Sequence, residues 1–263
     1  MRAFERASGA LPVTNPISGD TDTIAQEMAN SVEFNLLHMQ TFDPQRTPSL
    51  TIFANPDYFV SGSTACGTSL SPATSCVTQQ PGFAWNHGDV QPEITNTWLA
   101  MVGPGVDRVG VDRRTFSDHT DVRPTMLTLL GLKDDYAHEG RALVEKFVGW
   151  AQSPAVKKSA NFVALAAALK QINAAVGPFG LATLHASTVA LESGSADDDS
   201  LYTGIESQLA SFASQRDALV AQILPLLEAA QFTGTPISDS TALSLIRQAK
   251  NLLSNVEAYS GSL

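Results

Sequence analysis

Apolar residues recur at three- and four-residue spacing along much of the chain after residue 150. This period predicts amphipathic helices over residues 161–176, 200–230 and 238–256. The segment Pro178-Phe179-Gly180 and the acidic turn 193–199 are expected to separate them. Residues 151–263 are therefore expected to form a helical bundle or hairpin. The apolar stripe of the second helix is expected to serve packing: Ile205, Leu209, Phe212, Leu219, Ile223, Leu226 and Leu227.

Residues 1–150 differ in composition: Pro, Gly and His interrupt short apolar runs. We expect a helix over residues 24–39, with Asp22 or Thr21 as its N-cap. Two short apolar runs, 49–54 and 97–102, fit buried strands, and a loop of about forty residues lies between them. This order of elements is typical of an α/β domain.

The clearest helix of the first part covers residues 121–130. Asp121 is expected to cap it, Pro124 is tolerated in its first turn, and Gly131 ends it. Met126 and Leu130 are expected on its buried face, together with Val122 and Leu129.

Charge and hydropathy narrow the classes of partner. The chain carries 16 basic and 26 acidic residues, a net charge of −10, and has no basic run, so nucleic acid is not an expected partner. No apolar run reaches the ~18 residues that predict a membrane span, and residues 1–16 lack the apolar region of a signal peptide. Cys66 and Cys76 lie in one loop, where they either form a disulfide or remain free thiols.

His87 is the first candidate metal ligand. It lies in the sequence Trp85-Asn86-His87-Gly88-Asp89, where an exposed imidazole has a carboxylate two positions away. His119, in Ser117-Asp118-His119-Thr120-Asp121, is instead interpreted as part of a helix entrance.

The segments HGDVQPEITNTWLAMVGPGV, SDHTDVRPTMLTLLGL and HEGRAL, in this order, resemble the latter half of the alkaline phosphatase superfamily. That superfamily includes type I phosphodiesterases, nucleotide pyrophosphatases and sulfatases, and the resemblance covers about residues 22–145. It implies that residues 1–150 are the C-terminal portion of an α/β/α sandwich with a mainly parallel sheet. The all-α tail, 151–263, lies outside it.

The resemblance also implies a site. His87 is similar to the family's last metal-binding histidine, and Asp57 takes the place of a metal-binding aspartate at a strand end. The family has a histidine after that aspartate, whereas this chain has Tyr58, so Tyr58 or Asp89 is a possible substitute ligand. The expected ions are divalent, zinc first, with manganese or calcium as alternatives. Trp85 and Phe83 are expected to form a pocket wall.

No histidine occurs in residues 1–37, and no counterpart of the family's early ligands or its Ser/Thr nucleophile precedes residue 24. The expectation is therefore a metal-dependent hydrolase of small phosphoric esters, present as an inactive fragment whose Met1 is an internal start. Sulfuric esters stay open as substrates. The full-length protein would be extracellular or periplasmic. The alternative is a degenerate, non-catalytic member that acts as an interaction or assembly protein.

Overall fold

The computed structural model describes residues 1–41, 43–56, 58–60, 77, 79–83 and 87–263, which form two compact units. The first comprises Met1–Trp98, Thr183–Ala210 and Leu263, and the second comprises Leu99–Ala182 and Ser211–Ser262. The domain boundary expected near residue 150 stays a prediction.

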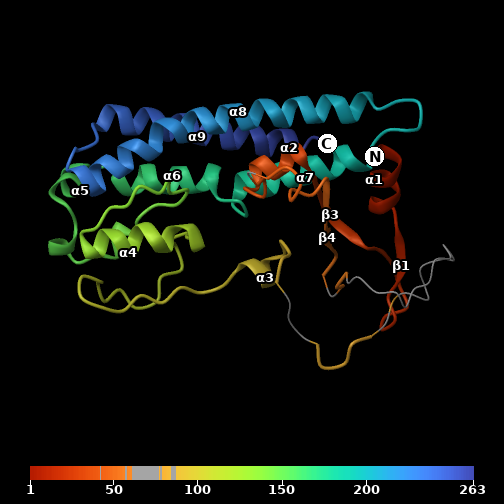
Figure 1. Cartoon of the computed structure of the whole chain (residues 1–263), viewed down its shortest axis with the longest axis horizontal. Helices are drawn as coiled ribbons and strands as arrows, with labels where there is room; N and C mark the ends of the chain where they lie inside the picture. Colours follow the sequence, from red (N-terminus) through yellow and green to blue (C-terminus); the bar gives the residue numbers. More distant parts are fainter. Residues whose placement is uncertain (42, 57, 61–76, 78, 84–86) are drawn as a thin grey trace. The chain divides into compact units, whose positions relative to one another are not determined.

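The first unit is built on two small antiparallel strand pairs (Figure 1). β1 pairs with β2, and β3 pairs with β4 in a register from Ala25 opposite Ala54 to Asn30 opposite Leu50. The elements between Met1 and Trp98 are α1 (Arg2–Gly9), β1 (Pro12–Thr14), β2 (Thr21–Thr23), β3 (Ala25–Asn30), α2 (Ser31–Leu36), β4 (Leu50–Ala54) and α3 (Pro92–Thr95).

The β3–β4 pair packs on one face of α7 (Pro178–Glu192). Ala29 is buried in one cluster with Leu184, and Met28 is buried in another with Leu191. Thr188 lies between these two leucines on the helix and accepts a hydrogen bond from the Met28 backbone N–H at 2.8 Å. The sheet edge and the helix are therefore joined by both apolar packing and a polar contact.

The second unit is mainly helical. Its largest contact joins α6 to α9, where Leu165 and Leu169 of α6 and Leu245 and Leu252 of α9 are buried. Its elements are η2 (His119–Asp121), α4 (Val122–Leu130), η3 (Val144–Lys146), η4 (Gly149–Ala151), α5 (Pro154–Lys158), α6 (Phe162–Asn173), the first turn of α7, α8 (Ser200–Glu228) from Ser211 onward, the π-helical turn η5 (Ala229–Thr233) and α9 (Asp239–Ser260).

The expected fold class is wrong. The chain is 51% helical and 8% strand, and its strands within the described ranges form antiparallel pairs instead of a parallel sheet. The helix expected over 24–39 is a strand followed by the short helix α2, because pairing with β4 and packing on α7 override the local helical spacing. The run 97–102 forms no strand, and Trp98 and Val102 are 86% and 97% exposed.

The helices expected after residue 150 are confirmed as α6, α8 and α9. α7 was missed, because Pro178 and Gly180 lie within its first turn, where proline needs no N–H partner. The segment Phe162–Glu192, which contains α6 and α7, is long and apolar enough to cross a membrane. Its most apolar window is 61% buried, as in the core helices of soluble proteins, so this is weak evidence for a span.

Candidate functional site

The expected metal ligands lie partly outside the described residues. His87 is exposed on an irregular segment of the chain. Asp57 and the expected pocket residue Trp85 lie outside the described residues, as do Cys66 and Cys76. The pairing of His87 with Asp57 and the disulfide therefore stay predictions.

The described neighbours of these positions have other contacts. The Tyr58 hydroxyl donates a hydrogen bond to Asp22 Oδ2 at 2.7 Å, and Asp89 Oδ1 accepts one from the Val90 N–H at 2.9 Å. The rings of Phe83 and Phe59 lie 5.5 Å apart. Among the residues that the structure describes, no group of three His, Cys, Asp or Glu side chains could hold a metal ion. These residues alone therefore do not form a metal centre.

The other two segments that carry the resemblance fold against each other around Asp121. Asp121 is fully buried, and its Oδ1 accepts a hydrogen bond from the Arg141 backbone N–H at 2.8 Å. One turn later, Thr125 Oγ1 accepts from the Leu143 backbone N–H at 3.0 Å. Two hydrogen bonds thus fix residues 141–143 along the entrance of α4.

Gly140 makes this close approach possible. A Cβ atom at Gly140 would lie 2.3 Å from the carbonyl carbon of Thr120 and 2.7 Å from the backbone nitrogen of Asp121. The obstacle is backbone, which cannot rotate away as a side chain does. Glycine is therefore required at this position by the packing of the two segments.

The entrance of α4 is a capping box. Asp121 occupies the N-cap position of α4, but its side chain caps no N–H of that helix. The capping box belongs to η2, whose N-cap is Asp118: the Asp118 side chain accepts from the Thr120 N–H, while the Asp121 carboxylate accepts from the Asp118 N–H. At the other end, Gly131 adopts the left-handed conformation with φ 66°, as expected of the residue that ends a helix. The interpretation of the His119 segment as a helix entrance agrees with this geometry.

The buried face of α4 differs from the expected one. Met126 and Leu130 are 56% and 66% exposed, whereas Pro124 and Thr125 are buried. The hydrogen bond from Leu143 to Thr125 turns that side of the helix toward residues 141–143. Apolar periodicity alone therefore gave the wrong face.

Lys170 of α6 neutralises the capping box. Its side chain is 2% exposed, and its Nζ lies 2.7 Å from Asp118 Oδ2 and 3.2 Å from Asp121 Oδ1. It also donates to Thr120 Oγ1 at 3.0 Å. The ammonium group thus bridges both carboxylates at the helix entrance.

The two carboxylates respond differently to this environment. Burial acts to raise the pKa of Asp118, but hydrogen bonds from Lys170 and Thr120 outweigh it and lower this pKa. Burial is stronger at Asp121 and raises its pKa, although Lys170 and the Arg141 N–H act in the opposite direction. Lys170 is a residue that sequence reasoning missed; its only signal is a single charge on an otherwise apolar helix, FVALAAALKQIN.

Arg141 is also committed to structure. Its guanidinium donates to both oxygens of Glu145, at 2.8 and 2.7 Å, and its side chain is 2% exposed. Each charged group around Asp121 is therefore paired with one of opposite charge. The cluster positions α4 and residues 141–143, and it presents neither a nucleophile nor an open ligand position.

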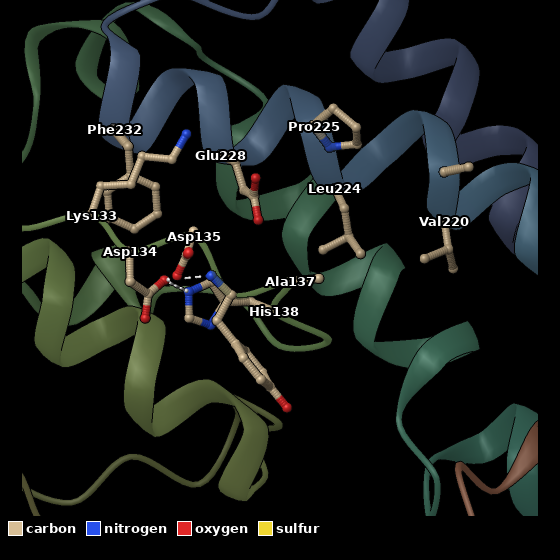
Figure 2. Close-up of a pocket in the computed structure, with 12 residues that line it drawn as sticks. Lys133, Asp134, Asp135, Ala137, His138, Val220, Leu224, Pro225, Glu228 and Phe232 are labelled. Atoms are coloured by element: carbon tan, nitrogen blue, oxygen red, sulfur yellow. Dashed lines mark hydrogen bonds and ion pairs between the residues drawn. The ribbon is translucent and has the colours of Figure 1, made fainter. Parts of the chain in front are cut away.

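A second place of interest is an open pocket within the second unit, with a volume of about 440 Å³. It lies between residues 133–138 and α8 (Figure 2). Asp134 Oδ1 lies 3.1 Å from His138 Nε2, and the Arg123 Nε donates to Asp134 Oδ2 at 2.9 Å. Burial opposes ionisation of Asp134, but these two partners lower its pKa.

In comparisons with models of protein families, with curated proteins and with solved structures, nothing matches the chain.

Proposed function

We propose that this chain contributes the closing portion of a metal-dependent phosphoric-ester hydrolase. In this proposal His87 and Asp57 are ligands of a divalent ion, zinc first, with Tyr58 or Asp89 as a substitute ligand. A metal would there polarise the phosphoryl oxygen of a small ester. No residue of this chain is assigned as the nucleophile.

The observation that supports the proposal most is the pairing of the two resembling segments. The two segments meet through a buried hydrogen bond between Arg141 and Asp121, twenty residues apart in sequence, and through a contact at Gly140 that only glycine permits. A resemblance by chance would not require that both segments belong to one local structure. The exposure of His87 also fits a ligand that faces a separate part of a site.

The first test is metal binding by the printed chain. Zinc added to the protein is expected to perturb the NMR resonances of the His87 ring, and His87→Ala is expected to abolish that binding. His119→Ala is the matched control, since His119 is also exposed but belongs to the helix entrance. Equal loss of zinc binding in both variants, or none in either, would contradict the assignment of His87.

The second test is catalysis. We expect the printed chain to hydrolyse neither p-nitrophenyl phosphate nor bis-p-nitrophenyl phosphate with added zinc or manganese. If the genomic reading frame continues upstream, the extended protein is expected to hydrolyse one of them and to lose about 100-fold or more in kcat/KM on His87→Ala. A p-nitrophenyl sulfate arm separates sulfuric from phosphoric esters. Turnover by the printed chain would show that the nucleophile lies within it.

One observation favours the alternative, a non-catalytic interaction or assembly protein. Tyr58 stands where the resembling family has a histidine ligand, and its hydroxyl is engaged with Asp22. An extended protein that binds zinc but hydrolyses none of the three esters would support this alternative.

A further inference from the structure

The open pocket of the second unit carries an excess of negative charge. Its titratable lining consists of Lys133, Asp134, Asp135, Tyr136, His138 and Glu228. Asp134 is already paired with Arg123 and His138. By contrast, among the described residues no ion pair or hydrogen bond engages the side chains of Asp135 and Glu228, so these two carboxylates oppose a single lysine.

The α8 wall of the pocket contains a proline inside the helix. Pro225 lies inside this helix and has no N–H to donate to the carbonyl of Ala221, four residues earlier. Ala221 also lines the pocket, one helical turn before Pro225. Pro225 therefore interrupts the backbone hydrogen bonding of α8 in the wall that carries Glu228.

The rest of the α8 wall is apolar. Val220 and Leu224 line it, and Figure 2 shows Leu224 and Glu228 extending from α8 toward the segment that carries Asp135. The helix then changes to the π-helical turn Ala229–Thr233, which places Phe232 in the lining. Turns of this kind inside or at the end of α-helices are frequent at functional sites.

We propose that this pocket binds a small organic cation, a primary amine with an apolar body. The ammonium group would lie between Asp135 and Glu228, and the apolar body would contact Leu224 and Phe232. This site is independent of the hydrolase function proposed above.

The lining argues against two other classes of ligand. No described group of three acidic, His or Cys side chains is arranged to hold a metal ion, here or elsewhere. An anion would meet two unpaired carboxylates and only Lys133 as an attractive charge. The apolar wall and the acidic excess together favour an amine over either.

The test is titration of the 263-residue chain with 2-phenylethylamine, followed by NMR. Shifts are expected at pocket residues with a dissociation constant on the order of 1 mM, as fits a ligand with about ten non-hydrogen atoms in an open site. The neutral 2-phenylethanol and the anionic 3-phenylpropanoate are expected to bind at least about fivefold more weakly. Equal binding of all three, or no binding of the amine, would overturn the proposal.

Variants locate the site. Glu228→Gln and Asp135→Asn keep the side-chain size and remove one charge each, and each is expected to weaken amine binding about fivefold. Glu257→Gln, on the exposed face of α9, is the matched control and is expected to leave binding unchanged. If one pocket variant fails to fold, the other still decides. Unchanged binding in a folded pocket variant would overturn the proposal.

Discussion

Replacing Gly140 by alanine is expected to disrupt the contact between the two resembling segments. The added Cβ would lie 2.3 Å from both the carbonyl carbon and the carbonyl oxygen of Thr120, whereas ordinary contacts of this kind lie at 3.4–4 Å. The Cβ is fixed to the backbone of residue 140, and the atoms that it meets belong to the backbone of Thr120 and Asp121. No rotamer change can relieve the clash, so the backbone has to move by about 1 Å. That movement separates the Arg141 N–H from its acceptor on Asp121.

The cost has two parts. Overpacking of this kind costs about 1–3 kcal/mol. Loss of the hydrogen bond from Arg141 to the buried Asp121 carboxylate adds about 1.5–3 kcal/mol, since the acceptor is charged and loses one of its partners. We therefore expect Gly140→Ala to lower the free energy of unfolding of the second unit by about 3–5 kcal/mol.

Urea denaturation with hydrogen exchange measures this effect where it arises. Protection of the Arg141 and Leu143 amides, which donate to Asp121 and Thr125, is expected to fall with the midpoint of unfolding. Gly149→Ala is the matched control, because nothing lies within 4 Å of a Cβ at that position. If Gly140→Ala lowers the free energy of unfolding by no more than about 0.5 kcal/mol relative to this control, Gly140 does not lie in close contact with Thr120. The main support for the proposed function is then lost.

Three further changes test other parts of the structure. Lys170→Met leaves the buried Asp121 and the partly buried Asp118 without their cation and is expected to cost about 3–5 kcal/mol at neutral pH. Because the pKa of Asp118 is lowered on folding, its ionised form stabilises the fold above its unfolded pKa, and this contribution is lost as the pH falls through its folded pKa. The cost of Lys170→Met, measured by urea denaturation at several pH values, should therefore shrink in acid. A cost that does not change with pH would contradict the ion pair. Glu206→Gln should raise the melting temperature by about 2 °C at pH 7, because burial, the largest cause, raises the pKa of Glu206 and makes its ionised form unfavourable. That gain should disappear as the pH is lowered to 4.5, the ordinary pKa of a glutamate, and its persistence there would show that a cause other than charge is responsible. Asn30→Ala removes the side chain that accepts from the Val32 N–H at the start of α2, together with its amide contacts with Tyr202 and Glu206, and should cost at least about 1 kcal/mol by denaturation. Asn30→Asp should retain the cap but place a second carboxylate beside Glu206, so it should be destabilising at pH 7 and less so in acid.

The elements that could be predicted are those whose local signals agree with their tertiary contacts. α8 and α9 repeat apolar residues at helical spacing, and α4 ends at a glycine that adopts the left-handed conformation. The helix expected over 24–39 failed because Met28 and Ala29 bury against α7 from a strand, a long-range contact that no local pattern contains. The prediction missed α7 because residues typical of a loop, Pro178 and Gly180, occupy its first turn, so here the local signal was misleading.

The candidate site divides in the same way. Asp121 could be placed at a helix entrance from its neighbours in sequence, and Gly140 could be marked by the resemblance. Their meeting could not be predicted, since it depends on a backbone contact across twenty residues. The contact of Lys170 is less predictable, because its partner Thr120 lies fifty residues away in sequence. A single lysine on an apolar helix predicts a buried charge, but it does not identify the partner.

The Asp118 and Asp121 carboxylates already have hydrogen-bond and ion-pair partners, and this favours His87 over His119 as the metal ligand of the proposed site. Asp118 accepts from the Thr120 backbone and pairs with Lys170, while Asp121 accepts from the Asp118 and Arg141 N–H groups and pairs with the same lysine. A metal ion at this motif would have to displace an ammonium group and open the helix cap. His87 lies on an exposed segment and carries no such cost. Metal binding and the stability of α4 should therefore be separable, with His87 variants changing only the first and Lys170 variants changing only the second.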